Sequence, residues 1–139
     1  MIEHAFYFPV NTSFIALGKG SRKKINYEKG IYRYGFHGLS YRYLMQVLQQ
    51  HNAEKANQDR IILAHLGNGA SMTAVTNGQS IDTTMAMTPS AGLVMGTRSG
   101  ELDPGLFGVL NRSESMTGEQ FETMINQQSG LLGISTTTS

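Results

Sequence analysis

Three short segments in the middle of the chain read as consecutive β-strands, and they constrain the fold most. Arg60–Leu66 is an apolar run rich in branched residues, and Ser71–Thr76 and Ser80–Thr84 follow it. The dipeptide Asn77-Gly78 joins the last two segments and favours a two-residue hairpin, because both residues tolerate positive φ. The pattern therefore predicts an antiparallel meander of three strands.

The turn between the first two strands has a composition suited to anions. Gly67, Asn68 and Gly69 form it, and glycine lets a backbone approach a ligand closely and present its N–H groups. Such groups bind phosphate without a lysine, and the side chains of Asn68 and Ser71 would add donors. An ordinary hairpin needs the same residues, so both interpretations stay open.

A second glycine-containing loop, Thr88–Gly100, carries the arginine Arg98. The planar guanidinium offers a rigid fork of donors that matches phosphate or carboxylate. A solvated loop arginine is the alternative, since exposed arginines often have no specific partner. Acidic residues end the loop, and Asp103-Pro104 is typical of a helix start, with aspartate as N-cap and proline at the first helical position.

A histidine precedes the first predicted helix. Ser40 is a good N-cap for a helix over about Tyr41–His51, so His37 would lie in the loop that enters its N-terminus, a location suited to anions. A purely structural histidine is the alternative. The apolar residues expected on the buried face are Leu44, Val47 and Leu48.

The remaining segments are predicted to form two surface connections and two helices. Asn52–Asp59 is polar and predicts a surface connection, and Lys19–Lys24 predicts a solvated basic loop. A helix is expected from Asp103 to about Arg112. Another should open at Thr117-Gly118 and end near Ser129-Gly130 by glycine capping.

Four strings in order resemble the acetate kinase family, which includes propionate kinases: RYGFHGLS, HLGNGAS, DTTMAMTP and GLVMGTRSGELDP. The resemblance implies an α/β fold with the actin/Hsp70/sugar-kinase (ribonuclease H-like) core, of which this chain would be an incomplete domain, the first part of the second domain. The family-like region spans 27–135, with a poorly matched segment at 1–26 and a polar tail at 136–139.

The resemblance also implies a reaction, the reversible transfer of the ATP γ-phosphoryl group to acetate or propionate, giving an acyl phosphate and ADP with Mg²⁺. His37 and Arg98 would be the catalytic residues. His37 would stabilise the phosphoryl group in transfer, and Arg98 would orient the carboxylate. The nucleotide phosphates would meet His65, Gly67, Asn68 and Gly69, and Glu3 would be an outer magnesium ligand. His65 can equally be a structural strand-end histidine.

Departures from the family pattern leave an alternative function open. Tyr41 stands where the family has a second histidine, and Ala91 stands where it has a glutamate. The family's serine-rich phosphate motif and its adenosine-binding segment do not occur in this sequence. We therefore expect little or no activity from the isolated chain. A non-catalytic remnant or interaction module that retains the kinase core is the alternative.

Composition excludes several partners. The formal net charge is +1, which gives no field to attract nucleic acid or an anionic membrane. The chain has no cysteine and no apolar run long enough to span a bilayer. A cytoplasmic protein that binds a small carboxylate and a nucleotide is expected. The family's homodimer is uncertain for this chain.

Overall fold

The computed structural model describes residues 35–57 and 60–135. The predictions on Glu3, on Lys19–Lys24 and on the tail at 136–139 therefore lie outside the described residues. The chain divides into two compact units. Unit 1 comprises Met1–His65 and Ser71–Pro89, and unit 2 comprises Leu66–Ala70 and Ser90–Ser139. Each unit is described by itself.

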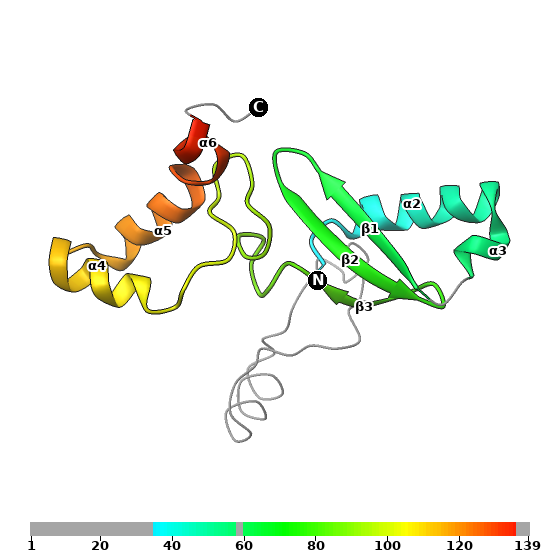
Figure 1. Cartoon of the computed structure of the whole chain (residues 1–139), viewed down its shortest axis with the longest axis horizontal. Helices are drawn as coiled ribbons and strands as arrows, with labels where there is room; N and C mark the ends of the chain where they lie inside the picture. The colour runs from blue at the N-terminus through cyan, green and yellow to red at the C-terminus, as the bar shows by residue number, and fades with distance from the viewer. Residues whose placement is uncertain (1–34, 58–59, 136–139) are drawn as a thin grey trace, which may run out of the picture. The chain divides into compact units, whose positions relative to one another are not determined.

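The predicted meander is confirmed as a sheet of order β1-β2-β3 (Figure 1). Its strands are β1 (Ile61–Leu66), β2 (Ala70–Thr76) and β3 (Gln79–Thr83), each within one residue of the predicted bounds. The hairpin between β2 and β3 turns at Asn77 and Gly78, whose φ angles are 49° and 72°. Positive φ at both central residues matches the right-handed twist of the flanking strands, which explains why Asn-Gly stands there.

The antiparallel register of β2 and β3 contains one irregularity. Thr73 pairs with Thr83, and Val75 pairs with Ser80, with a shift between Ala74 and Val75. The hydroxyl groups of Thr73 and Ser80 lie 2.6 Å apart in the interior, and Thr73 also donates to the Asp82 carbonyl. This local bulge keeps both buried hydroxyl groups paired, as buried polar groups require.

Helix α2 (Gly38–His51) covers one face of this sheet. The core joins Tyr41 of the helix to Leu63 of β1 and Val75 of β2, and Leu44, Met45 and Ile61 pack against it. The predicted buried face is confirmed in part, because Leu44 contacts the core and Val47 and Leu48 are half-buried.

One prediction near α2 is wrong, and another is incomplete. The N-cap is His37 and not Ser40, because the Tyr41 N–H already bonds to the His37 carbonyl and the helix therefore begins one turn earlier. The predicted surface connection contains a short helix, α3 (Ala53–Ala56). Asn52 begins it by accepting a hydrogen bond from the Lys55 N–H at 2.9 Å, and Ala56 is buried.

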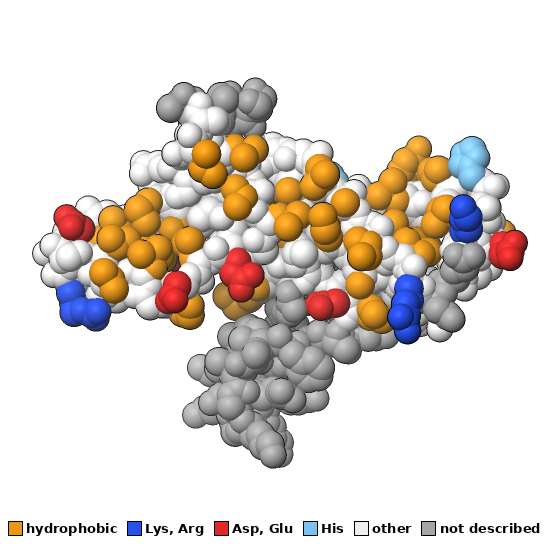
Figure 2. Space-filling model, in the orientation of Figure 1, with side chains coloured by type: hydrophobic (Ala, Val, Ile, Leu, Met, Phe, Trp, Pro, Cys, Tyr) orange, Lys and Arg blue, Asp and Glu red, His pale blue; other side chains and the backbone are white. Residues whose placement is uncertain are grey.

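The outward side chains of the strands leave an apolar surface. Ile62 is 74% exposed, and Met72 and Ile81 are 37% and 38% exposed. Hydrophobic side chains gather over the strands in Figure 2. A sheet normally buries its apolar side chains against another layer. No helix in the described part of the chain is long and apolar enough to cross a membrane.

Unit 2 consists of a long loop followed by α4 (Leu106–Glu114), α5 (Gly118–Gln127) and α6 (Gly130–Ser135). The expected N-cap at Asp103 is wrong by two residues, because Gly105 is the N-cap of α4. The Asp103 carboxylate accepts from the Gly105 N–H at 2.6 Å, which closes a turn ahead of the helix. The expected glycine cap of α5 is also wrong, because Gln128 is the C-cap of α5 and Gly130 begins α6.

The predicted start of α5 is confirmed by a capping box. The Thr117 hydroxyl accepts from the Gln120 N–H, and the Gln120 side chain accepts from the Thr117 N–H. We expect Thr117→Ala to lower the free energy of unfolding by about 1 kcal/mol, because it leaves a helical N–H without its partner. Urea unfolding of the chain measures this. Ser113→Ala, at an exposed position in α4, is the control, and an equal loss in both variants would contradict the capping role.

Candidate functional site

The predicted site residues fall into two groups. His37 and His65 belong to unit 1, whereas the Gly67–Gly69 turn and Arg98 belong to unit 2.

His37 is the N-cap residue of α2, which confirms that it lies at the start of a helix. Its Nδ1 lies 2.8 Å from the hydroxyl oxygen of Ser71 on β2. Ser71 is fully buried, so its side chain faces the core and does not add a donor to the glycine turn, contrary to the sequence interpretation. The histidine is thus held at a helix N-terminus, where backbone N–H groups and the helix dipole favour negative charge.

Tyr41, one helical turn after His37, was missed as a site residue. Its ring is fully buried, and its hydroxyl group hydrogen-bonds to the same Ser71 hydroxyl. Burial raises the pKa of Tyr41, and the hydrogen bond to Ser71 opposes this rise. The phenol therefore keeps its proton at neutral pH. The signal in the sequence was the spacing of four residues from His37, which places both side chains on one helix face.

His65 lies beside His37, and these two predicted residues are brought together. Their rings stack with centroids 3.9 Å apart and an interplanar angle of 17°. The His65 Nδ1 lies 3.0 Å from the Ser40 hydroxyl oxygen. Strand alternation explains the contact, because His65 points to the same side of β1 as the buried Leu63, toward α2.

The glycine turn of unit 2 uses part of its own hydrogen-bonding capacity. The Gly67 N–H donates to the Gly69 carbonyl at 3.0 Å, and the Asn68 carbonyl accepts from the Gly96 N–H at 3.2 Å. The phosphate-binding prediction therefore rests on the N–H groups of Asn68 and Gly69. The bond to Gly96 ties the turn to the loop that carries Arg98.

Arg98 is half-buried in a loop with fixed backbone geometry. Its carbonyl accepts from the Met95 N–H at 3.0 Å, and its guanidinium Nη1 lies 3.5 Å from the Met95 sulfur. Met95 itself is buried. The neighbouring Ser99 N–H donates to the Ile125 carbonyl of α5 at 2.9 Å. Backbone hydrogen bonds at Arg98 itself and at the next residue, Ser99, therefore hold the loop that carries the guanidinium.

The α5–α6 junction also supports this loop. The Ser129 N–H donates to the Thr97 carbonyl, and the Leu131 N–H donates to the Met95 carbonyl, at 3.0 and 2.9 Å. Gly130 lies between these two donors with a φ of +67°, and a Cβ on it would meet the Arg98 carbonyl oxygen at 2.6 Å. Only glycine allows so close a backbone approach.

The acidic residues give no magnesium site in the part that the structure describes. No three histidine or acidic side chains gather there in a way that could hold a metal ion. The Asp82 carboxylate accepts a hydrogen bond from the Thr83 N–H at 2.8 Å. Glu3, the predicted outer magnesium ligand, lies outside the described residues.

The comparisons with known proteins agree with one another. A sequence model of the Acetokinase family matches residues 11–139. Acetate kinase 1 of Neisseria meningitidis serogroup A is 53% identical over 110 residues, which cover 78% of this chain and 28% of that enzyme. The propionate kinase of Yersinia enterocolitica is 49% identical over 108 residues, covering 78% and 27%.

A solved structure gives the same result. The crystal structure of Porphyromonas gingivalis acetate kinase matches 95% of this chain with a TM-score of 0.81 and 38% identity, and the match covers 32% of that enzyme. The predicted kinase fold, as an incomplete domain, is confirmed. The chain spans about 28% of the length of the curated relatives.

Proposed function

Because the chain belongs to the acetokinase family, we propose that it supplies part of the active site of a carboxylate kinase. The reaction is the transfer of the γ-phosphoryl group of ATP to acetate or propionate, giving an acyl phosphate and ADP. What supports this proposal most is the structural match to an acetate kinase over 95% of the chain. The two acceptors differ by one methylene, which a hydrophobic pocket discriminates only weakly, so both stay candidates.

His37 is proposed to donate a hydrogen bond to the phosphoryl group during transfer. Phosphoryl transfer depends on positioning and on stabilising the negative charge of the equatorial oxygens, with little covalent chemistry. The hydrogen bond between the His37 Nδ1 and the Ser71 hydroxyl, together with the stacked ring of His65, fixes the imidazole in one place. Such a pre-positioned donor costs no reorganisation when charge develops.

Arg98 is proposed to orient the carboxylate and to share that charge. Its guanidinium fork can bind two oxygens at once, and its backbone is held by Met95 and the start of α6. The N–H groups of Asn68 and Gly69 are proposed to bind nucleotide phosphates. Mg²⁺ is expected with the nucleotide, and no step is assigned to it here. A cytoplasmic location, the family's homodimer and the absence of nucleic-acid partners stay predictions.

The proposal has a direct test in a chimera. Residues 27–135 would replace the matching segment of the N. meningitidis acetate kinase. We expect the chimera to form acyl phosphate from MgATP and acetate or propionate, trapped with hydroxylamine. The isolated 139-residue chain should form almost none, because the chain spans about 28% of that enzyme and single charge-stabilising donors are each worth about a hundredfold or more in rate. A folded but inactive chimera would favour the remnant alternative.

A further inference from the structure

Two asparagines in the sequence are followed directly by glycine, a pair of residues that can modify itself. Asn68-Gly69 lies in the bend between β1 and β2, and Asn77-Gly78 is the hairpin turn between β2 and β3. Both asparagines are exposed, so water reaches their side-chain amides. Glycine has no Cβ beside its backbone nitrogen, and that nitrogen can therefore approach the preceding side chain closely.

The self-modification is a deamidation that needs water and no other reagent. The glycine nitrogen attacks Cγ of the asparagine side chain, and its proton leaves with the side-chain NH₂ as ammonia. The product is a five-membered succinimide ring. Water opens this ring at either of its two carbonyl groups, which gives aspartate or isoaspartate, whose main chain runs through the side-chain carbon. Both products carry a carboxylate where a neutral amide stood.

The backbone of Asn77 opposes this attack. Its φ of 49°, with 72° at Gly78, is that of the two-residue hairpin turn with left-handed central residues. The first central residue of this turn has a ψ of about +30°, which places the next nitrogen nearly opposite Cβ across the Cα–C bond. Attack requires that nitrogen on the same side as Cβ. The turn must therefore open, and the pairing of Thr76 with Gln79 must break, before Asn77 can react.

Asn68 does not have this obstacle. Positive φ occurs outside glycine at Asn77 and Ser115 in the part of the chain that the structure describes, so Asn68 lacks the left-handed backbone of the hairpin turn. Asn68 and Gly69 also lie outside both flanking strands. The Asn68 carbonyl accepts from the Gly96 N–H at 3.2 Å. Rotation of the Gly69 nitrogen toward the side chain disturbs bonds of the bend and breaks no strand pairing.

We propose that Asn68-Gly69 is a site of spontaneous deamidation in the folded chain, whereas the hairpin protects Asn77-Gly78. The change falls on the turn whose N–H groups are proposed to bind nucleotide phosphates, and this consequence rests on the proposed function. A carboxylate at position 68 repels a phosphate group. Isoaspartate also lengthens the main chain and displaces the Gly69 N–H. Phosphate binding by the turn is therefore lost as the protein ages.

Peptide mapping of the 139-residue chain, after incubation at mildly alkaline pH, tests the proposal. Both sites lie in one tryptic peptide, Ile61–Arg98, and its fragment masses assign each site. We expect aspartate and isoaspartate to form about tenfold faster at position 68 than at position 77, because the hairpin bonds between Thr76 and Gln79 must open first at position 77. In urea, where the hairpin is absent, the two sites should react at similar rates.

Gly69→Ala is the matched variant. Gly69 is not among the described glycines with positive φ, so alanine fits its backbone. Its methyl group crowds the attacking nitrogen, and the isoaspartate signal at position 68 should be lost. An unchanged signal in this variant would mean that the Gly69 nitrogen is not the attacking group.

Two other results would overturn the proposal. One is equal rates at the two sites in the folded chain, and the other is an unmodified position 68 under conditions in which the urea-treated chain reacts. If circular dichroism shows the isolated chain to be unfolded, the folded chimera gives the same comparison. Loss of acyl-phosphate formation in proportion to isoaspartate at position 68 is expected in the ageing chimera. Modification without that loss would refute the phosphate-binding role of the turn, and modification in a chimera inactive from the start would refute the proposed function alone.

Discussion

Arg98→Ala is expected to lower acyl-phosphate formation by the chimera about a thousandfold. The guanidinium is the only proposed positive charge for the carboxylate and the transferring phosphoryl group in the described part of unit 2. Arginines that stabilise such transition states are worth about 10³-fold or more in kcat. The fold should survive, because the loop is held by backbone bonds of Met95, Thr97 and Ser99 that the substitution leaves in place.

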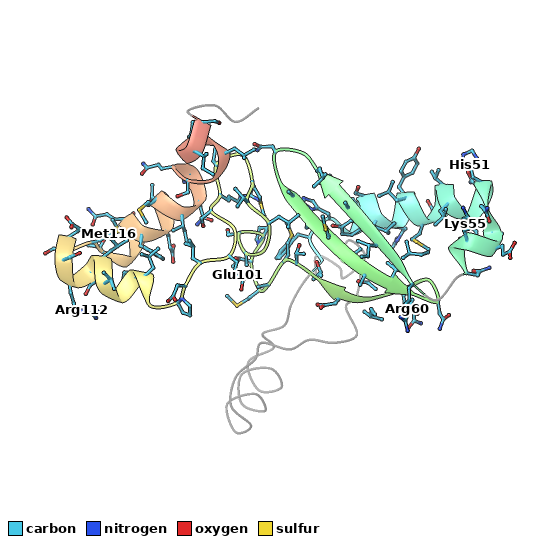
Figure 3. All side chains as sticks on the ribbon, viewed as in Figure 1. His51, Lys55, Arg60, Glu101, Arg112 and Met116 are labelled. Carbon is cyan, nitrogen blue, oxygen red and sulfur yellow. The ribbon has the colours of Figure 1, made fainter. Side chains whose placement is uncertain are left out.

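Two further variants make this result specific. Arg98→Lys keeps the charge but loses the planar fork, so it should recover only part of the rate. Arg112→Ala removes a cation from α4, at the position labelled in Figure 3, and should leave the rate unchanged. If Arg98→Ala kept more than about a tenth of the rate, Arg98 would have no direct part in the transfer.

Gly130→Ala is expected to destabilise unit 2 by about 3 kcal/mol. Its φ of +67° costs an alanine about 1–2 kcal/mol, and the added methyl group would press into the Arg98 carbonyl oxygen and, closer still, that of Met95. Backbone atoms cannot rotate away, so the start of α6 must move and its bonds to the Arg98 loop must lengthen. Urea unfolding of the chain, followed by circular dichroism, measures the loss.

The chain contains a matched control for this substitution. Gly133 lies in the same helix, and a Cβ there would meet its nearest neighbour, the Gln128 carbonyl oxygen, at an ordinary 3.7 Å. Gly133→Ala should therefore be neutral or slightly stabilising, since alanine favours helix more than glycine does. Equal stability of the two variants would show that the close backbone approach at Gly130 does not hold the loop.

Local sequence patterns predicted the parts of the fold that local interactions determine. The branched, apolar run at Arg60–Leu66 and the Asn77-Gly78 turn predicted the meander, and Thr117 predicted the start of α5, where it forms a capping box. The errors at Ser40 and Asp103 both concern the residue at which a helix begins. Both are good N-cap residues, but the backbone had already begun to wind before Ser40, and at Asp103 it closed a separate turn first.

The contacts of the candidate site were less predictable because they join distant segments. Ser71 is 34 residues from His37 and 30 from Tyr41, and only the packing of α2 on the sheet brings these groups together. Alternation along β2 tells which side Ser71 faces but not which helix lies there. The loop of Arg98 is likewise held by carbonyl–amide bonds to the α5–α6 junction, which no side-chain pattern encodes.

The decisive measurement is the reverse reaction, ATP formation from ADP and acetyl phosphate, followed by luminescence. The chimera, its Arg98→Ala variant and the isolated chain can be compared side by side at equal concentration. If the chain is a segment of a carboxylate kinase, the chimera should form ATP, and its Arg98→Ala variant should form ATP about a thousandfold more slowly. The isolated chain should form almost no ATP. ATP formation by a folded chimera no faster than by its Arg98→Ala variant would contradict the proposal.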